Sequence, residues 1–113
     1  MSTAVIVLTL DEIDGVKAIM PRVKKEWAEK IIFVDGGSKD GTVEEAKRLG
    51  YDVIHQHNRG EGNAFRIGID NTDSDYVLMF SPDGNDVPED IPVLIKKIKE
   101  GYDIVHISRF GKE

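Results

Sequence analysis

Hydrophobic residues occur in short continuous runs, separated by longer stretches in which they recur at helical spacing. The continuous runs lie at 4–8, 31–34 and 76–80, and a partly apolar run lies at 51–57. Short apolar runs rich in β-branched residues are typical of strands that are covered on both faces of a sheet. The run at 103–107 has the same character, so the pattern predicts five strands.

The stretches between these runs predict helices. Apolar residues recur at helical spacing from 13 to 27, and Pro21 is expected to kink or restart that helix. Thr42 and Glu45 have the spacing of a capping box at the start of a second helix. That helix is expected to end just before Gly50, which can adopt a left-handed conformation.

Two further helices complete an alternation of strands and helices. A short helix is expected from Ala64, after a loop at 58–63, and the segment 88–92 is expected to open another. Alternation of this kind predicts an α/β fold, with right-handed crossovers, a mostly parallel sheet and helices on both faces. The expected architecture is a three-layer αβα sandwich that forms one domain over residues 1–113.

Composition narrows the classes of function. The chain has 113 residues, with 15 basic and 21 acidic side chains and a net charge of −6, which argues against a general nucleic-acid binder. The absence of cysteine excludes disulfides, thiolate metal sites and cysteine nucleophiles. The N-terminal apolar run is too short and uncharged for a signal peptide, and no run is long enough for a transmembrane segment. These features predict a soluble, cytoplasmic protein.

Acidic residues follow several of the predicted strands. Asp11 and Glu12 follow the first strand, Asp35 the second and Asp83 the fourth. The carboxyl ends of parallel strands share one edge of a sheet, and open α/β sheets bind ligands at that edge. Asp83, in a tight Pro-Asp-Gly loop, is the first candidate for a ligand of a divalent metal that holds a phosphate.

The segments that carry these residues resemble a known family. They are 9–12, 32–42, 58–64, 81–84 and 108–109, in that order along the chain. Together they are similar to family 2 glycosyltransferases, especially the dolichol- or polyprenyl-phosphate mannose and glucose synthases. The resemblance implies the GT-A fold, a nucleotide-diphosphate sugar such as a GDP- or UDP-hexose, Mg²⁺ or Mn²⁺, and inverting transfer to a polyprenyl phosphate.

The resemblance also implies roles for individual residues. The implied nucleotide-sugar-binding residues are Leu10, Glu12, Asp35, Gly37, Asp40, Arg59, Gly60, Gly62 and Pro82, and the implied catalytic residues are Asp83 and Arg109. Glu12 and Asp35 would hold the base and the ribose, and Asp40 would support their loop. Asp83 would bind the metal that bridges the diphosphate. Arg109 would face the diphosphate or the acceptor phosphate.

The chain departs from the family pattern in several places. Ser81 stands where the family commonly has the first aspartate of Asp-x-Asp, Asp11 where it has asparagine, and Glu61 near a position that is usually lysine. The resemblance covers only the nucleotide-binding half of the family's core and implies a chain truncated before the acceptor half. A non-catalytic nucleotide-binding domain is therefore the alternative function. A polyprenyl acceptor would imply peripheral contact with a membrane.

Other functions fit the residues less well. A phosphoacceptor domain using Asp35 or Asp83 would need a lysine that terminates the fifth strand, and none stands at that position. His55 and His57 could present two metal ligands, but no third ligand is evident nearby. The glycines at 60–65 mimic a dinucleotide fingerprint only in part, and no P-loop motif occurs. An uncovered strand edge predicts self-association, as in a homo-oligomer.

Overall fold

The computed structural model of the protein describes residues 2–56, 61–84 and 86–100. Within these residues, four strands form one sheet: β1 (Thr3–Thr9), β2 (Lys30–Asp35), β3 (Asp52–His55) and β4 (Tyr76–Phe80). All pairings are parallel and the strand order is β3-β2-β1-β4. The first strand in the sequence is therefore central, and its carboxyl end lies between those of β2 and β4.

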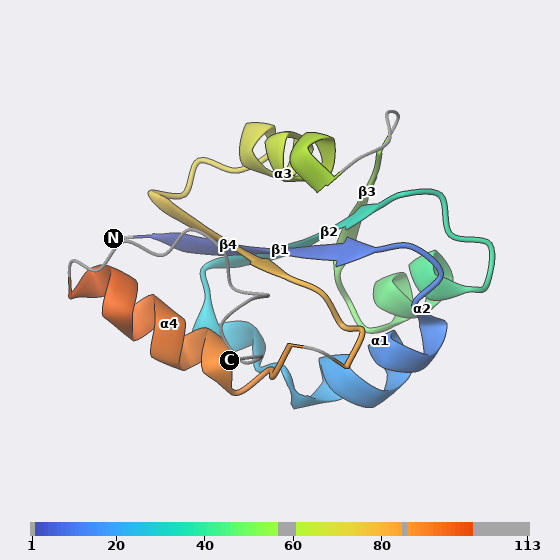
Figure 1. Ribbon diagram of the computed structural model, residues 1–113, viewed down its shortest axis with the longest axis horizontal. Coiled ribbons are helices and arrows are strands. Elements are labelled where there is room, and N and C mark those ends of the chain that lie inside the picture. The colour runs from blue at the N-terminus through green and yellow to red at the C-terminus, as the bar shows by residue number, and fades with distance from the viewer. Residues whose placement is uncertain (1, 57–60, 85, 101–113) are drawn as a thin grey trace.

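Helices cover both faces of the sheet, which confirms the three-layer α/β prediction. The helical elements are α1 (Ile13–Ile19), the 3₁₀ turns η1 (Met20–Arg22) and η2 (Lys25–Trp27), α2 (Thr42–Arg48), α3 (Glu61–Asp70) and α4 (Asp90–Lys99). In Figure 1, α3 lies on one face of the sheet, and α1, α2 and α4 lie on the other.

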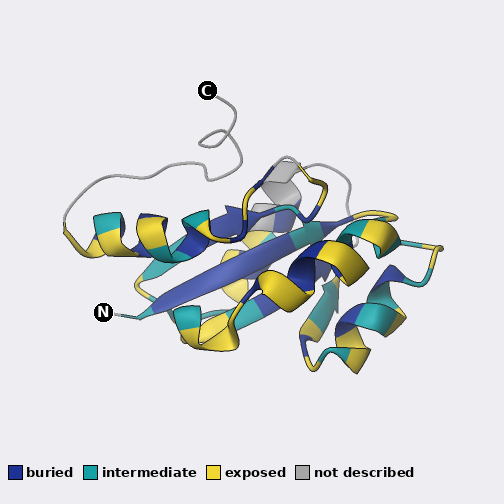
Figure 2. Ribbon diagram, turned by 90° about the horizontal axis from the view of Figure 1, so that it is seen from below, coloured by how far each residue is buried: buried dark blue, intermediate teal, exposed yellow. Residues whose placement is uncertain are grey.

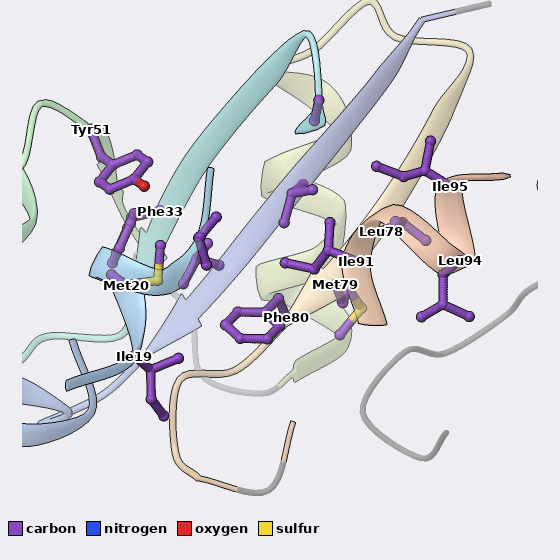
Figure 3. Close-up of a cluster of buried hydrophobic side chains, with 14 of the residues drawn as sticks. Ile19, Met20, Phe33, Tyr51, Leu78, Met79, Phe80, Ile91, Leu94 and Ile95 are labelled. Atoms are coloured by element: carbon purple, nitrogen blue, oxygen red, sulfur yellow. The ribbon is translucent and has the colours of Figure 1, made fainter. Parts of the chain in front are cut away.

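The two faces of the sheet carry cores of different size. Alternate residues of the strands point to opposite faces, so Ile6 and Ile32 pack with Ala64 of α3 on one side. Val5 and Phe33 point the other way, into the larger cluster. Figure 3 shows that larger cluster, to which the labelled Ile19, Met20, Phe33, Tyr51, Leu78, Met79, Phe80, Ile91, Leu94 and Ile95 contribute.

Burial follows the amphipathic pattern of the sequence. In Figure 2 the helices seen from below turn exposed residues outward and buried residues toward the sheet, while the central strand is almost wholly buried. In α4, for example, Ile91, Leu94 and Ile98 are buried, whereas Val93 is 46% exposed. The buried faces of the helices thus pack on the sheet. Polar side chains that could bind a ligand lie in the loops at the strand ends.

The helical pattern at 13–27 corresponds to three short elements, not to one helix. Helix α1 ends at Ile19, and Pro21 occupies the start of the 3₁₀ turn Met20–Arg22. A proline ring cannot continue an α-helix, because it removes an N–H donor and clashes with the preceding turn. The predicted restart at Pro21 is confirmed, but the pattern from there to Trp27 folds as 3₁₀ turns.

The predicted capping box is wrong. The N-cap of α2 is Gly41, in a left-handed conformation with φ of 97°, and this residue has no side chain with which to cap the helix. Thr42 already lies inside the helix, and its hydroxyl is engaged by Glu12 and Asp40 of neighbouring loops. Glu45 pairs with Arg48 instead of reaching back. The predicted end of the helix is confirmed, because Gly50 follows it with φ of 92°.

Helix α3 begins at Glu61, not at Ala64, so residues 61–63, which were expected to lie in a loop, belong to the helix, and Gly62 is among them. Its packing on the sheet is close: a Cβ on Gly68 would lie 2.2 Å from Ile6 Cδ1. The predicted strand at 103–107 lies outside the described residues. Over the described ranges, no helix is long and apolar enough to cross a membrane.

Candidate functional site

The loop after β1 and the loop after β2 hold each other at the carboxyl edge of the sheet. The Asp11 N–H donates to Ser38 Oγ over 2.7 Å, and the Lys39 N–H donates to Asp11 Oδ1 over 2.7 Å. Asp11 has a positive φ of 52°, which aspartate tolerates better than most residues because its short polar side chain can hydrogen-bond locally. These reciprocal bonds fix the path of the chain that leads into Glu12.

Asp35 closes β2 with its side chain turned into the protein. Its Oδ1 accepts hydrogen bonds from Thr9 Oγ1 at 2.7 Å and Ser38 Oγ at 2.6 Å. Its Oδ2 accepts from the N–H groups of Gly37 at 2.9 Å and Ser38 at 2.7 Å. Asp35 is 1% exposed. Both carboxylate oxygens therefore serve the loop after β2 and tie it to the end of β1.

This network sets the charge state of Asp35. Burial alone would raise the pKa of its carboxyl group, but the hydrogen bonds from Ser38, Thr9 and Gly37 outweigh burial and hold the pKa below its usual value. The carboxylate is thus ionised and internally satisfied. A direct contact of this side chain with a nucleotide, as the resemblance implies, would have to replace one of these bonds.

Glu12 lies at the N-cap of α1 and is fixed through its backbone. Its N–H donates to the buried hydroxyl oxygen Thr42 Oγ1 over 2.9 Å. Partial burial raises the pKa of its carboxyl group, and the nearby charges of Asp83, Asp40 and Asp11 raise it further. Glu12 and Asp83, which are far apart in the sequence, therefore lie within electrostatic range of each other.

Asp40 supports the start of two helices. Its Oδ2 accepts from the Ile13 N–H at 3.1 Å, and its Oδ1 accepts from the Thr42 N–H at 3.0 Å and from the Thr42 hydroxyl. The hydrogen bond from the Thr42 hydroxyl is the main reason that the pKa of Asp40 lies below its usual value. Asp40 thus links the segment that carries Glu12 to the beginning of α2.

Asp83 lies in the turn after β4, and its side chain is exposed. The preceding Pro82 is buried, and its carbonyl lies directly against Gly15 of α1. On the strand side of the turn, the Ser81 N–H donates to Oδ2 of the buried Asp86 over 2.9 Å. The turn is therefore anchored on both sides of Asp83, and it presents that carboxylate to solvent on the side where Glu12 lies.

The remaining candidate residues have different surroundings. Leu10 is 57% exposed, and its Cδ1 would lie 3.6 Å from a Cβ placed on Gly36. Gly37 has φ of 109°, and a Cβ there would meet nothing within 4 Å. An apolar side chain and an open glycine backbone thus line the same edge as the carboxylates. Arg59, Gly60 and Arg109 lie outside the described residues.

The donor chemistry of this edge suits a hard divalent cation. Among the described residues, no group of three or more His, Cys, Asp or Glu side chains could hold a metal ion by itself. Mg²⁺ is usually bound through one or two carboxylates together with substrate phosphates, and it keeps several waters. Asp83, with Glu12 in range, fits this kind of site better than a cage made of protein ligands alone.

Sequence patterns did not identify several residues that build the site. Ser38 and Thr9 hold Asp35, Thr42 holds Glu12, and Gly15 admits the loop that carries Asp83. A glycine within a helical pattern can signal close packing, which was the one available hint for Gly15. Thr9 and Thr42 gave no such hint, because the residues that their hydroxyl groups contact lie 26 and 30 positions away in the sequence. The contact of Ser38 with Asp35 is local.

Comparison with known proteins identifies the family. The sequence model of the family described as "Glycosyl transferase family 2" matches residues 4–113. The chain belongs to glycosyl transferase family 2. It is 33% identical over 104 residues to glycosyltransferase AglJ of Haloferax volcanii, covering 91% of this chain and 34% of that protein. It is 28% identical over 122 aligned positions to undecaprenyl-phosphate 4-deoxy-4-formamido-L-arabinose transferase of Proteus mirabilis, covering 97% and 37%.

A solved enzyme structure shares the fold. Glucosyl-3-phosphoglycerate synthase of Mycobacterium tuberculosis, in complex with Mn²⁺ and UDP-glucose, superposes with a TM-score of 0.72 at 25% identity. The match covers 88% of this chain and 40% of that enzyme. The chain therefore spans between a third and a half of the length of each of these three proteins.

Proposed function

We propose that this family 2 chain binds a nucleotide-diphosphate sugar through Mg²⁺ or Mn²⁺, as the donor-binding part of a hexosyltransferase. The observation that carries the proposal is the meeting of Glu12 and Asp83 at the carboxyl edge of the sheet, beside the Asp35 loop. Support comes from the Mycobacterium synthase, whose structure holds Mn²⁺ and UDP-glucose.

Each element of the edge has a role in this proposal. Asp83 is exposed and would hold the cation together with the two phosphates of the donor. Glu12 and the glycine-containing segment 36–37 would face the nucleoside, beside the exposed Leu10. Asp35 and Asp40 would act indirectly, by fixing the loops. A divalent cation bound here would offset the charge of the departing nucleotide diphosphate.

The proposed acceptor is a polyprenyl phosphate, to which a hexose would be transferred with inversion. The Proteus relative is named as an undecaprenyl-phosphate transferase, which supports this class of acceptor. A phosphate acceptor is already ionised at neutral pH, so attack on the sugar requires no general base from the protein. The reaction would then depend on positioning of the two substrates and on charge stabilisation by the bound cation.

Calorimetry tests the binding proposal directly. UDP, GDP and their hexose conjugates are titrated into the protein with Mn²⁺, with Mg²⁺ and with EDTA. We expect binding of at least one nucleotide that depends on the cation and is abolished by Asp83→Asn. Replacing the exposed Asp73, which lies before β4 and away from this edge, by Asn is the matched control and should leave binding intact. Absence of heat with every nucleotide would refute the proposal.

The second candidate function is a nucleotide-binding domain without transferase activity. Ser81 favours it, because the family commonly has a carboxylate at that position and a hydroxyl offers less charge to a cation. Transfer of labelled sugar to a short polyprenyl phosphate separates the two candidates. Product formation by this chain supports the transferase, whereas nucleotide binding without product supports the binding domain.

A further inference from the structure

Gly15 is the third residue of α1, a place where glycine does not favour the helix. Glycine in a helix interior is less favourable than alanine by about 1 kcal/mol, because it loses more backbone freedom on folding. Its φ is not positive, so no special backbone conformation requires it. The reason for a glycine at this position must therefore lie in what it contacts.

The contact is made by the backbone of the loop after β4. A Cβ on Gly15 would lie 1.7 Å from the carbonyl oxygen of Pro82 and 2.9 Å from its carbonyl carbon. The same Cβ would lie 3.5 Å from Glu12 Oε2. A clash with backbone atoms cannot be relieved by a side-chain rotation, so α1 or the loop would have to move.

The position of this contact links the two carboxylates of the edge. The carbonyl of Pro82 belongs to the peptide bond that leads directly into Asp83, and the Glu12 carboxylate lies against the same glycine. The spacing between Glu12 and Asp83 therefore depends on how closely the loop approaches α1. Since Pro82 is itself buried, the loop has little freedom to seat elsewhere.

We infer that Gly15 is a positioning residue of the nucleotide–cation site: its lack of a side chain lets the Pro82 carbonyl rest on α1 and sets the distance between Glu12 and Asp83. This inference rests on the proposed function, and it adds a residue outside the acidic loops. Gly15 touches no ligand in this account and acts only through the loop that carries Asp83.

The test compares two glycine-to-alanine substitutions in helices. Gly15→Ala places a methyl group against the Pro82 carbonyl, whereas Gly68→Ala places one against side-chain carbons of the buried Ile6, on the opposite face of the sheet. Binding of UDP and GDP with Mn²⁺ is measured for both variants by calorimetry, and thermal unfolding is measured in parallel. Two-dimensional ¹⁵N–¹H spectra report whether the Asp83 amide moves.

For Gly15→Ala we expect affinity for nucleotide with Mn²⁺ to fall about tenfold to a hundredfold, the range typical when a residue that orients a metal ligand is replaced. The Asp83 amide should shift in the spectrum. For Gly68→Ala we expect a change in unfolding temperature with unchanged affinity in the folded protein. A purely structural role for Gly15 would lower stability but leave the affinity of the folded fraction as it is in the wild type.

A second variant covers the case in which Gly15→Ala does not fold. Pro82→Gly leaves α1 intact and frees the loop backbone, so the same contact is loosened from the other side. It should also weaken nucleotide binding in the presence of Mn²⁺. Wild-type affinity in Pro82→Gly, or in a folded Gly15→Ala, overturns the inference while the proposed function stands. If the wild-type chain binds neither nucleotide, the proposed function fails and the positioning role fails with it.

Discussion

Asp35 and Asp83 occupy similar places in the sequence but very different places in the structure. Both come after an apolar strand, and both precede a glycine. Asp35 is the last residue of β2, is 1% exposed and accepts four hydrogen bonds from its own loop and from β1. Asp83 comes after the end of β4, in an exposed turn.

The difference shows that one sequence signal serves two purposes at the same edge. A carboxylate within the last position of a buried strand is surrounded by the N–H groups of the following loop, and it stabilises that loop. A carboxylate that follows the strand by a few residues is carried outward on a turn, where it can meet a ligand. Asp35 therefore fixes the loop after β2, whereas Asp83 is exposed at the same edge of the sheet.

The largest effect should come from removing the buried carboxylate. Asp35→Ala leaves the N–H groups of Gly37 and Ser38 and the Thr9 hydroxyl without their acceptor. Unpaired donors are costly when buried, as the Thr9 hydroxyl is, and the part-buried N–H groups add to the loss. We therefore expect the free energy of unfolding to fall by about 3 kcal/mol in urea denaturation. Asp83→Ala is the matched control and should change it by less than about 0.5 kcal/mol. Equal losses in the two variants would contradict the division of roles.

The free energy of unfolding at acid pH should also depend on the Asp35 carboxylate. Because the folded-state pKa of Asp35 lies below 3.8, its ionised form stabilises the fold above that pH. This contribution is lost as the pH falls through the lowered folded-state pKa. The stability difference between the wild type and Asp35→Asn should therefore be constant near neutral pH and shrink below 3.8. A difference that stays constant to the lowest accessible pH would contradict this explanation.

A smaller effect is expected at the hydroxyl that joins the two regions. Thr42→Val keeps the shape of the side chain but removes the acceptor for the Glu12 N–H and the donor to Asp40. We expect a loss of about 1–2 kcal/mol in urea denaturation, together with a shift of the Glu12 amide in ¹⁵N–¹H spectra. Thr42→Ser restores the hydroxyl and should recover the amide position. If Thr42→Ser does not recover the wild-type position of the Glu12 amide, the hydroxyl of Thr42 is not what fixes Glu12.

The fold was predictable from local pattern to a much greater extent than the site. The strands at 3–9, 30–35 and 76–80 were recognised because they are continuous apolar runs, and Gly50 ended α2 as expected. Thr42 was misassigned because a capping box is a local pattern, whereas the hydroxyl is engaged by a loop 30 positions away. The same limit applies to Asp35, since its partner Thr9 lies on another strand.

The smallest expected effect concerns Glu12, whose carboxylate lies near the exposed Asp83. Its pKa is raised by partial burial and by the charges of Asp83, Asp40 and Asp11. The ionised form therefore costs stability above its folded-state pKa, and this cost disappears below 4.5, where the group is protonated in both the folded and unfolded states. In EDTA at pH 7, Glu12→Gln should raise the unfolding temperature slightly, and the gain should vanish near pH 4.

The effect of Mn²⁺ on stability tests whether the Glu12 carboxylate faces a bound ligand or only destabilises the fold. If Asp83 binds the cation and Glu12 faces the nucleotide bound with it, adding Mn²⁺ with nucleotide should raise the unfolding temperature of the wild type more than that of Glu12→Gln. The difference in unfolding temperature between the two proteins should then narrow or reverse. Asp35→Asn should show no such narrowing, because its carboxylate is fully occupied within the loop. An identical Mn²⁺ response in both variants would mean that Glu12 belongs with Asp35 among the residues that shape the edge, leaving Asp83 to face the ligand.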